Sequence, residues 1–192
     1  MTTIVAVKSD VGVVLAGDGR VVAGERIITN NQSKVLRIGQ TLYGIAGNTG
    51  ITSGIIASIE SNRSDNTEIP IDVFAAHLAA SIRKAIANKE TGYPDNDYKY
   101  EVIVASYDGL WLLDSDGSCI SGRELPFGWD IVATGTGAPV ALAAMQTFGE
   151  INYVDATIDD IVAAAVRGIT LASEYDTNTG GMITPLVLPM QD

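Results

Sequence analysis

Two short stretches near the start of the chain decide the fold: Thr-Thr-Ile-Val-Ala-Val at residues 2–7 and Ala-Gly-Asp-Gly at residues 16–19. They belong to two β-branched runs, Thr3–Lys8 and Gly12–Gly17, which the short segment Ser9-Asp10-Val11 joins. Two such runs around so short a connection predict a tight antiparallel hairpin. We therefore expect an antiparallel sheet at the start of the chain.

Thr2 follows the start methionine directly, and a methionine before a small residue is normally removed. Removal would leave the hydroxyl and the α-amine of Thr2 on one residue. An α-amine titrates near pH 8, roughly, so it can accept a hydroxyl proton close to neutrality. Thr2 is therefore a candidate N-terminal nucleophile, although very many cytosolic chains also begin with Met and a small residue.

The composition is that of a globular chain with few charges. Its 192 residues are 46% apolar, enough for a sizeable core, and we expect one domain spanning residues 1–192. Only 18% of the residues are charged, against a usual fraction of about 25%. We therefore expect a homo-oligomer in which part of this weakly charged surface is buried. The alternative is a plain compact domain with a Ser/Thr/Asn-rich surface.

Charge and cysteine content exclude several classes of partner. A net charge of −11 with scattered Lys and Arg argues against nucleic acid, because phosphate binding needs clustered cations. The single cysteine, Cys119, excludes an intrachain disulfide and fits a reducing compartment. No targeting signal is apparent, and no apolar stretch reaches the ~18 residues that span a bilayer. With His77 as the only histidine, we expect no metal, no cofactor, no membrane partner and a cytoplasmic location.

The remaining elements follow in the order strands, two helices, strands, two helices, strand. The predicted strands span 26–29, 34–38, 41–46, 100–107, 110–114, 131–134 and 182–188. One helix is predicted to begin at 48–50, a second at Pro70, a third to span 140–148 and a fourth to begin at Thr157. Polar loops are predicted at 61–67 and 88–98. Thr157 and Asp160 form a capping-box pattern, and Pro185 places the last strand at a sheet edge or bulge. No helix lies between consecutive strands in a βαβ rhythm. The order predicts an α+β fold: a four-layer αββα sandwich of two antiparallel sheets flanked by helix pairs.

Taken alone, the polar and glycine residues near these elements have plain structural roles. Asp18-Gly19 is compatible with a hairpin end, Lys34 with a solvated strand terminus, and Gly44 with a bulge. The Gly135-Thr136-Gly137 segment is compatible with a helix N-terminus but lacks the lysine and spacing of a P-loop. These interpretations stay open on the residues alone.

Together, however, these residues resemble a proteasome-type β subunit of the N-terminal-nucleophile hydrolase superfamily, over most of the chain. The matching segments are residues 2–7, 16–19, Lys34, Tyr43–Gly47, 135–137 and 176–181. The start is especially similar to the HslV branch, whereas Gly180–Ile183 is closer to proteasome β subunits. Thr136 and Thr179 stand where the family has serines, and both keep the hydroxyl. The α-type subunits carry an extension before the first strand that this sequence does not show, which favours the β type.

The resemblance implies a role for each matching residue. Thr2 would attack the peptide carbonyl, with Lys34 lowering the pKa of the reacting groups and Asp18 fixing Lys34. The terminal amine and its water would be held by Asp176, Thr179 and Thr136. The oxyanion donor is expected at the backbone N–H of Gly44, where a missing Cβ lets substrate approach. The resemblance further implies a largely apolar specificity pocket lined by Val21, Gln32, Leu36, Leu42 and Ala46.

The sequence thus predicts a threonine-type endopeptidase that cleaves unfolded polypeptides inside a self-compartmentalising ring. The resemblance implies a double ring of hexamers or heptamers and an AAA+ ATPase partner that feeds it. Two alternatives remain at this point. One is a non-catalytic scaffold subunit of such a ring, and the other is an N-terminal-nucleophile amidase that acts on small molecules.

Overall fold

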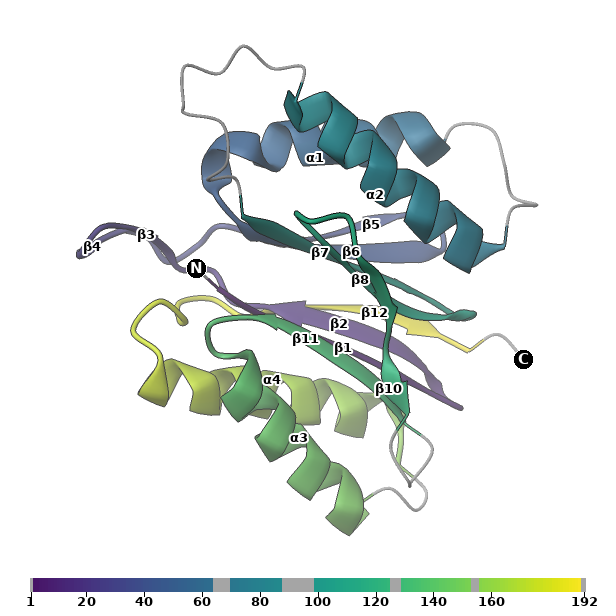
Figure 1. The fold of residues 1–192 in the computed structure, drawn as a ribbon. Helices are drawn as coiled ribbons and strands as arrows, with labels where there is room; N and C mark the ends of the chain where they lie inside the picture. The colour runs from purple at the N-terminus through teal and green to yellow at the C-terminus, as the bar shows by residue number, and fades with distance from the viewer. Residues whose placement is uncertain (1, 64–69, 88–98, 125–128, 153–155, 191–192) are drawn as a thin grey trace.

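Two five-stranded antiparallel sheets face each other, and a pair of helices covers the outer face of each (Figure 1). This computed structural model describes residues 2–63, 70–87, 99–124, 129–152 and 156–190. The four layers match the predicted αββα sandwich. No helix in these parts of the chain is both long and apolar enough to cross a membrane.

The first sheet has the strand order β10-β11-β1-β2-β12. Its strands are β1 (Thr3–Ser9), β2 (Gly12–Gly17), β10 (Arg123–Glu124), β11 (Asp130–Gly135) and β12 (Thr184–Pro189). Helices α3 (Ala138–Asn152) and α4 (Ile158–Tyr175) pack on its outer face. The predicted hairpin is confirmed, since β1 pairs with β2 from Ile4↔Gly17 to Ser9↔Gly12.

The second sheet has the order β5-β6-β7-β8-β9. Its strands are β5 (Val35–Ile38), β6 (Thr41–Gly47), β7 (Tyr100–Ser106), β8 (Gly109–Asp114) and β9 (Cys119–Ser121), and it is covered by α1 (Thr49–Arg63) and α2 (Ile71–Ala87). A separate pair, β3 (Val21–Ala23) and β4 (Arg26–Thr29), forms an arm that projects from the layers (Figure 1).

Buried side chains alternate between the layers with the period of two that a strand imposes. Along β1, Ile4 and Ala6 join the core between the sheets, whereas Val5 and Val7 join the core under α3 and α4. Because both faces are covered, the strand is apolar throughout rather than alternating. This burial fixes the register of β1 and therefore the position of the residue that precedes it.

Most predicted elements are present, with differences at their ends. Helix α1 runs to Arg63, so the loop predicted from Ser61 is wrong at its start. The hydroxyl of Ser61 and the amide of Asn62 donate back to Ser58 O and stay within the helix. The short strands β3, β9 and β10 were not predicted. The loop prediction for 88–98, and that for 64–67, lie outside the described residues.

Candidate active site

The catalytic candidates Thr2 and Asp18 meet at one end of the first hairpin. Thr2 precedes β1 and Asp18 follows β2, so the antiparallel pairing of Ile4 with Gly17 brings them side by side. The Asp18 N–H donates to Thr3 O at 3.1 Å, which extends the ladder by one bond. Thr2 is only 2% exposed and Asp18 only 1%.

Five donors hold the Asp18 carboxylate, one of them the Lys34 ammonium described below. Its Oδ1 accepts from the Thr3 N–H at 2.8 Å and from the Thr2 hydroxyl. Its Oδ2 accepts from the N–H groups of Arg20 at 3.1 Å and of Gly180 at 3.0 Å. Hydrogen bonds to a charged acceptor are stronger than neutral ones, so the buried carboxylate has a fixed position.

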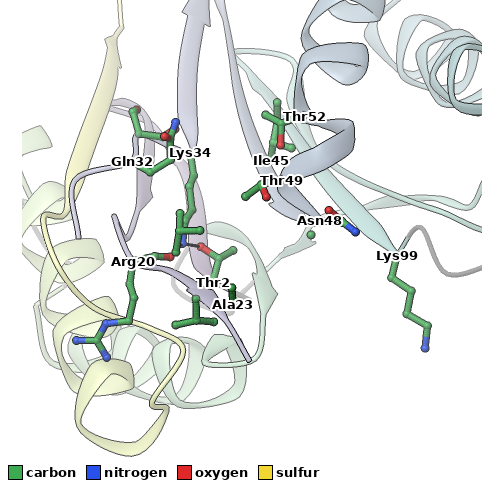
Figure 2. Close-up of a pocket in the computed structure, with 14 residues that line it drawn as sticks. Thr2, Arg20, Ala23, Gln32, Lys34, Ile45, Asn48, Thr49, Thr52 and Lys99 are labelled. Atoms are coloured by element: carbon green, nitrogen blue, oxygen red, sulfur yellow. Dashed lines mark hydrogen bonds between the residues drawn. The ribbon is translucent and has the colours of Figure 1, made fainter. Parts of the chain in front are cut away.

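Lys34, just before β5, completes this cluster from the second sheet (Figure 2). Its Nζ donates to Thr2 Oγ1, to Asp18 Oδ1 at 2.9 Å and to Arg20 O at 2.6 Å. An ammonium has three donors, and these three acceptors match them. Burial lowers the pKa of Lys34 below its ordinary value, and the neighbouring Asp18 opposes that effect. The cation therefore lies against the hydroxyl that is the candidate nucleophile.

A second polar cluster surrounds Asp176, which follows α4. Its Oδ2 accepts from the hydroxyls of Thr136 and, at 2.7 Å, of Thr179. Its Oδ1 accepts from the N–H and the side-chain amide of Asn178, at 3.1 and 3.2 Å. Burial acts to raise the pKa of Asp176, but these hydrogen bonds outweigh it and the pKa is lowered. Asp176 is thus held as a carboxylate.

This second cluster reaches β1 through Thr3 rather than Thr2. The hydroxyls of Thr3 and Thr179 lie 2.6 Å apart in a fully buried contact. Among the hydrogen bonds of the described residues, none joins Thr136, Asp176 or Thr179 directly to Thr2. The structure therefore brings the three predicted residues together, but they contact Thr3 and not Thr2, the residue that the resemblance implies.

Glycines are required where the end of β11 and the turn after it pass Thr2 and Thr3. Gly135 has φ +92°, and a Cβ on it would lie 1.8 Å from Thr2 O. A Cβ on Gly137 would lie 2.2 Å from Thr3 Oγ1. Side chains at these positions would displace Thr2 and Thr3, so the Gly-Thr-Gly segment is a close-packing feature of the site.

A main cavity of about 670 Å³ opens beside Thr2 (Figure 2). It is lined by Thr2, Arg20, Val21, Val22, Ala23, Gln32, Ser33, Lys34, Ile45, Gly47, Asn48, Thr49, Thr52 and Lys99. Val21 and Gln32 lie here as predicted. Ala46 instead lines a second cavity of about 450 Å³, which also contacts Thr2.

Three predicted positions lie elsewhere, and those expectations are corrected. Leu42 is fully buried in the core between the sheets, and Leu36 packs into the core under α1 and α2. Gly44 also faces the inter-sheet core, where a Cβ would lie 2.7 Å from Ile4 Cγ2. These positions are set by strand alternation, which sends neighbouring residues to opposite faces.

Gly47, which was not selected as the donor from the sequence, lines both cavities together with Thr2. The Ile45 N–H donates to Lys34 O at 2.8 Å, toward β5. Because N–H directions alternate along a strand, the Gly47 N–H is expected on the same side as that of Ile45, beyond the start of β5 at Val35. The feature of the sequence that could have pointed to Gly47 as the donor is its place as the last glycine before α1.

Arg20, Thr3 and Gly180 were also missed, because they contribute through backbone groups or from within a strand. Arg20 supplies a carbonyl to Lys34 and an N–H to Asp18, while its guanidinium donates to Thr177 O at 2.8 Å. Nothing in a residue type reveals such backbone roles. The conformation of the chain alone assigns them.

The sequence of the chain is similar to those of known proteins. A family model described as "Proteasome subunit" matches residues 1–188. The chain is 28% identical over 198 residues to the proteasome subunit beta of Methanopyrus kandleri, covering 100% of this chain and 88% of that protein. It is 26% identical over 185 residues to the ATP-dependent protease subunit HslV of a Caulobacter species, covering 95% and 91%.

Among solved structures, the fold is similar to that of BPH from Thiobacillus denitrificans, solved in complex with epoxomicin. The TM-score is 0.77 at 19% identity, over 99% of this chain and 100% of that one. At this identity the likeness supports the fold. The chemistry rests on the residues around Thr2.

Proposed function

We propose, from the premise that this chain belongs to the proteasome subunit family, that it is a threonine peptidase of the β type whose nucleophile is Thr2 Oγ1. The observation that carries the proposal is the buried contact of this hydroxyl with both Lys34 Nζ and Asp18 Oδ1. A lysine placed only for stability gains nothing from burial against a threonine hydroxyl, since burial disfavours its charge.

The proposed reaction begins once the Met1–Thr2 bond has been cleaved and Thr2 carries a free α-amine. Thr2 Oγ1 attacks the peptide carbonyl carbon while the α-amine, directly or through a water, accepts the hydroxyl proton. That proton passes to the leaving amine as the peptide C–N bond breaks and an ester remains on Thr2. Water then attacks the ester, releases the acyl product and restores the hydroxyl.

The neighbouring residues support these steps by charge and by position. The Lys34 ammonium stabilises negative charge that develops on Thr2 Oγ1, and Asp18 holds Lys34. The Asp176, Thr136 and Thr179 cluster fixes Thr3, and through it the backbone that carries the amine. The Gly47 N–H replaces Gly44 as the proposed oxyanion donor, a role typically worth about 3 kcal/mol in the transition state.

The two alternative functions fit less well. A scaffold subunit needs no Lys34–Asp18 pair against the Thr2 hydroxyl, and burying such a pair carries a desolvation cost. A small-molecule amidase would use the same nucleophile. However, two cavities of about 670 and 450 Å³ meet at Thr2, and a small substrate would not fill both of them. An extended peptide that passes through both cavities uses them.

The proposed assembly is inferred from the relatives named proteasome subunit beta and HslV. The chain is proposed to be one domain over residues 1–192 that joins a homo-oligomeric double ring of hexamers or heptamers. Unfolded polypeptides are the proposed substrates, an AAA+ ATPase the proposed partner, and the cytoplasm the proposed location. The low charged fraction of 18% supports buried surfaces between copies.

The direct test is peptidase activity of Thr2→Ala and Thr2→Ser variants on an unfolded protein and on internally quenched peptides. Thr2→Ala is expected to lose activity by at least about 10³-fold, because removing a nucleophile abolishes the covalent route. Thr2→Ser keeps the hydroxyl and should retain measurable activity. Thr170→Ala is the matched control, since its hydroxyl only bonds back to Val166 O on α4. Wild-type activity in Thr2→Ala would refute the proposal.

A further inference from the structure

The second cavity differs from the main one in charge. Both share Thr2, Gly47 and Lys99. The second cavity is lined by the carboxylates of Glu101, Asp114 and Asp116, whereas no carboxylate lines the main cavity within the described residues. The Lys99 side chain extends away from Thr2 (Figure 2). The space on one side of the nucleophile is therefore acidic, and the space on the other side is not.

Glu101 is the carboxylate best placed to meet a substrate. It pairs with Ala46 in the β6–β7 ladder, one residue before Gly47. Its side chain is half-buried, and its Oε2 accepts from the buried Thr134 hydroxyl, which fixes its direction. In the described parts of the chain ion pairs join Lys8 to Asp130 and Lys34 to Asp18, and none involves Glu101. A cation that enters the cavity therefore meets a carboxylate that is partly shielded from water and has no ion-pair partner among these residues.

The reaction assigns the two halves of a substrate to different cavities. The scissile carbonyl lies at Thr2 Oγ1, so the peptide extends from there into both. The acyl half stays bonded to Thr2 after the first step, whereas the amine half leaves and water takes its place. The main cavity is larger and flanked by strand β3, whose backbone groups suit an extended acyl segment. The acidic cavity therefore receives the leaving half.

We propose that Glu101 is a specificity-determining residue that binds a lysine or arginine side chain directly after the scissile bond. This inference rests on the proposed peptidase function and adds a substrate preference to it. The ammonium or guanidinium donates to Glu101, a charge-assisted bond, and Asp116 at the exposed rim attracts the same cation. The backbone of Asp116 is held by Arg83 on α2, whose guanidinium donates to Asp116 O at 3.4 Å.

The test compares internally quenched peptides that differ only by Lys, Gln or Glu after the cut, with the cut verified by mass spectrometry. In the wild-type protein the Lys peptide is expected to exceed the Glu peptide in kcat/KM by about tenfold, as a charged hydrogen bond provides. Glu101→Gln should reduce that ratio to near one, and Asp116→Asn should reduce it in part. Glu60→Gln, an exposed residue of α1 that lines neither cavity, should leave it unchanged.

The outcomes separate this inference from the proposed function. Peptides that wild type cleaves no faster than Thr2→Ala would refute the function itself. Cleavage with equal rates for Lys and Glu, a ratio unaffected by Glu101→Gln, or a preference confined to the residue before the cut would refute only the inference. If Glu101→Gln fails to fold, the inference is tested by the ratio of kcat/KM for the Lys and Glu peptides, measured on the wild-type protein at increasing salt concentration. This ratio must fall as charges are screened, and a salt-independent ratio refutes the role of Glu101.

Discussion

At the scale of single residues, the site depends on a cation whose three donors are all engaged. Lys34 donates to the Thr2 hydroxyl, to a carboxylate and to a backbone carbonyl. Thr2, Asp18 and Lys34 were expected together from the resemblance, because each is marked by its residue type. Arg20 contributes an N–H and a carbonyl, and backbone groups are the same in every residue. Such roles follow from conformation and were not accessible from the sequence.

The lowered pKa of Lys34 predicts the alkaline limit of activity. The α-amine must be neutral to act as base, so activity rises with pH through its pKa. Lys34 must stay protonated, so activity falls again as pH passes the pKa of Lys34, which burial holds below 10.5. A profile of kcat/KM against pH on an uncharged peptide measures this limb. A rate that does not fall at alkaline pH would contradict the assigned role of Lys34.

At the scale of elements, hydrophobic periodicity was enough for the long segments and failed where both faces are buried. The hairpin, the four helices and the edge position of β12 were predicted. On β6, every residue from Thr41 to Ala46 is buried, so the sequence carries no alternation that tells the two faces apart. Leu42 was placed in the pocket by the resemblance and Gly44 was chosen for its missing Cβ, and no alternation in the sequence spoke against either assignment. A shift of one residue along such a strand exchanges the faces.

The capping box of α4 gives a test of the fold at this scale. The Thr157 hydroxyl accepts from the Asp160 N–H at 3.3 Å, and Asp160 Oδ2 accepts from the Thr157 N–H at 2.9 Å. Thr157→Ala is expected to lower the free energy of unfolding by about 1 kcal/mol, because the Asp160 N–H loses its acceptor. Urea unfolding measures the change. Thr170→Ala, on the same helix, should cost clearly less, and equal losses would show that the cap does not stabilise α4.

At the scale of the whole molecule, the exposed apolar surface lies partly on the projecting arm. Ile27 and Ile28 of β4 are 53% and 59% exposed, on an arm that extends beyond the four layers (Figure 1). Strand β3 of the same arm lines the main cavity. Packing of the arm against another copy would therefore bury its apolar side chains and steady one wall of the site.

This arrangement predicts that assembly and activity are lost together. Wild type should have the mass of a double ring in light scattering, because burial of the arm offsets the entropy of association. Ile28→Asp, which places a charge in that contact, should shift the mass toward smaller species and lower peptidase activity. Asp10→Asn, at the exposed turn of the first hairpin, is the control. A wild-type chain that stays monomeric and fully active would contradict the ring.

The measurement that tests the central claim most directly is the intact mass of the purified chain, before and after a peptide epoxyketone. This reagent forms a ring adduct only where a hydroxyl and a free α-amine share one residue. We predict the loss of Met1 and a single adduct that Thr2→Ala abolishes, with Lys34→Ala slowing its formation. A chain that keeps Met1, or that loses it and takes no adduct, would contradict Thr2 as the N-terminal nucleophile.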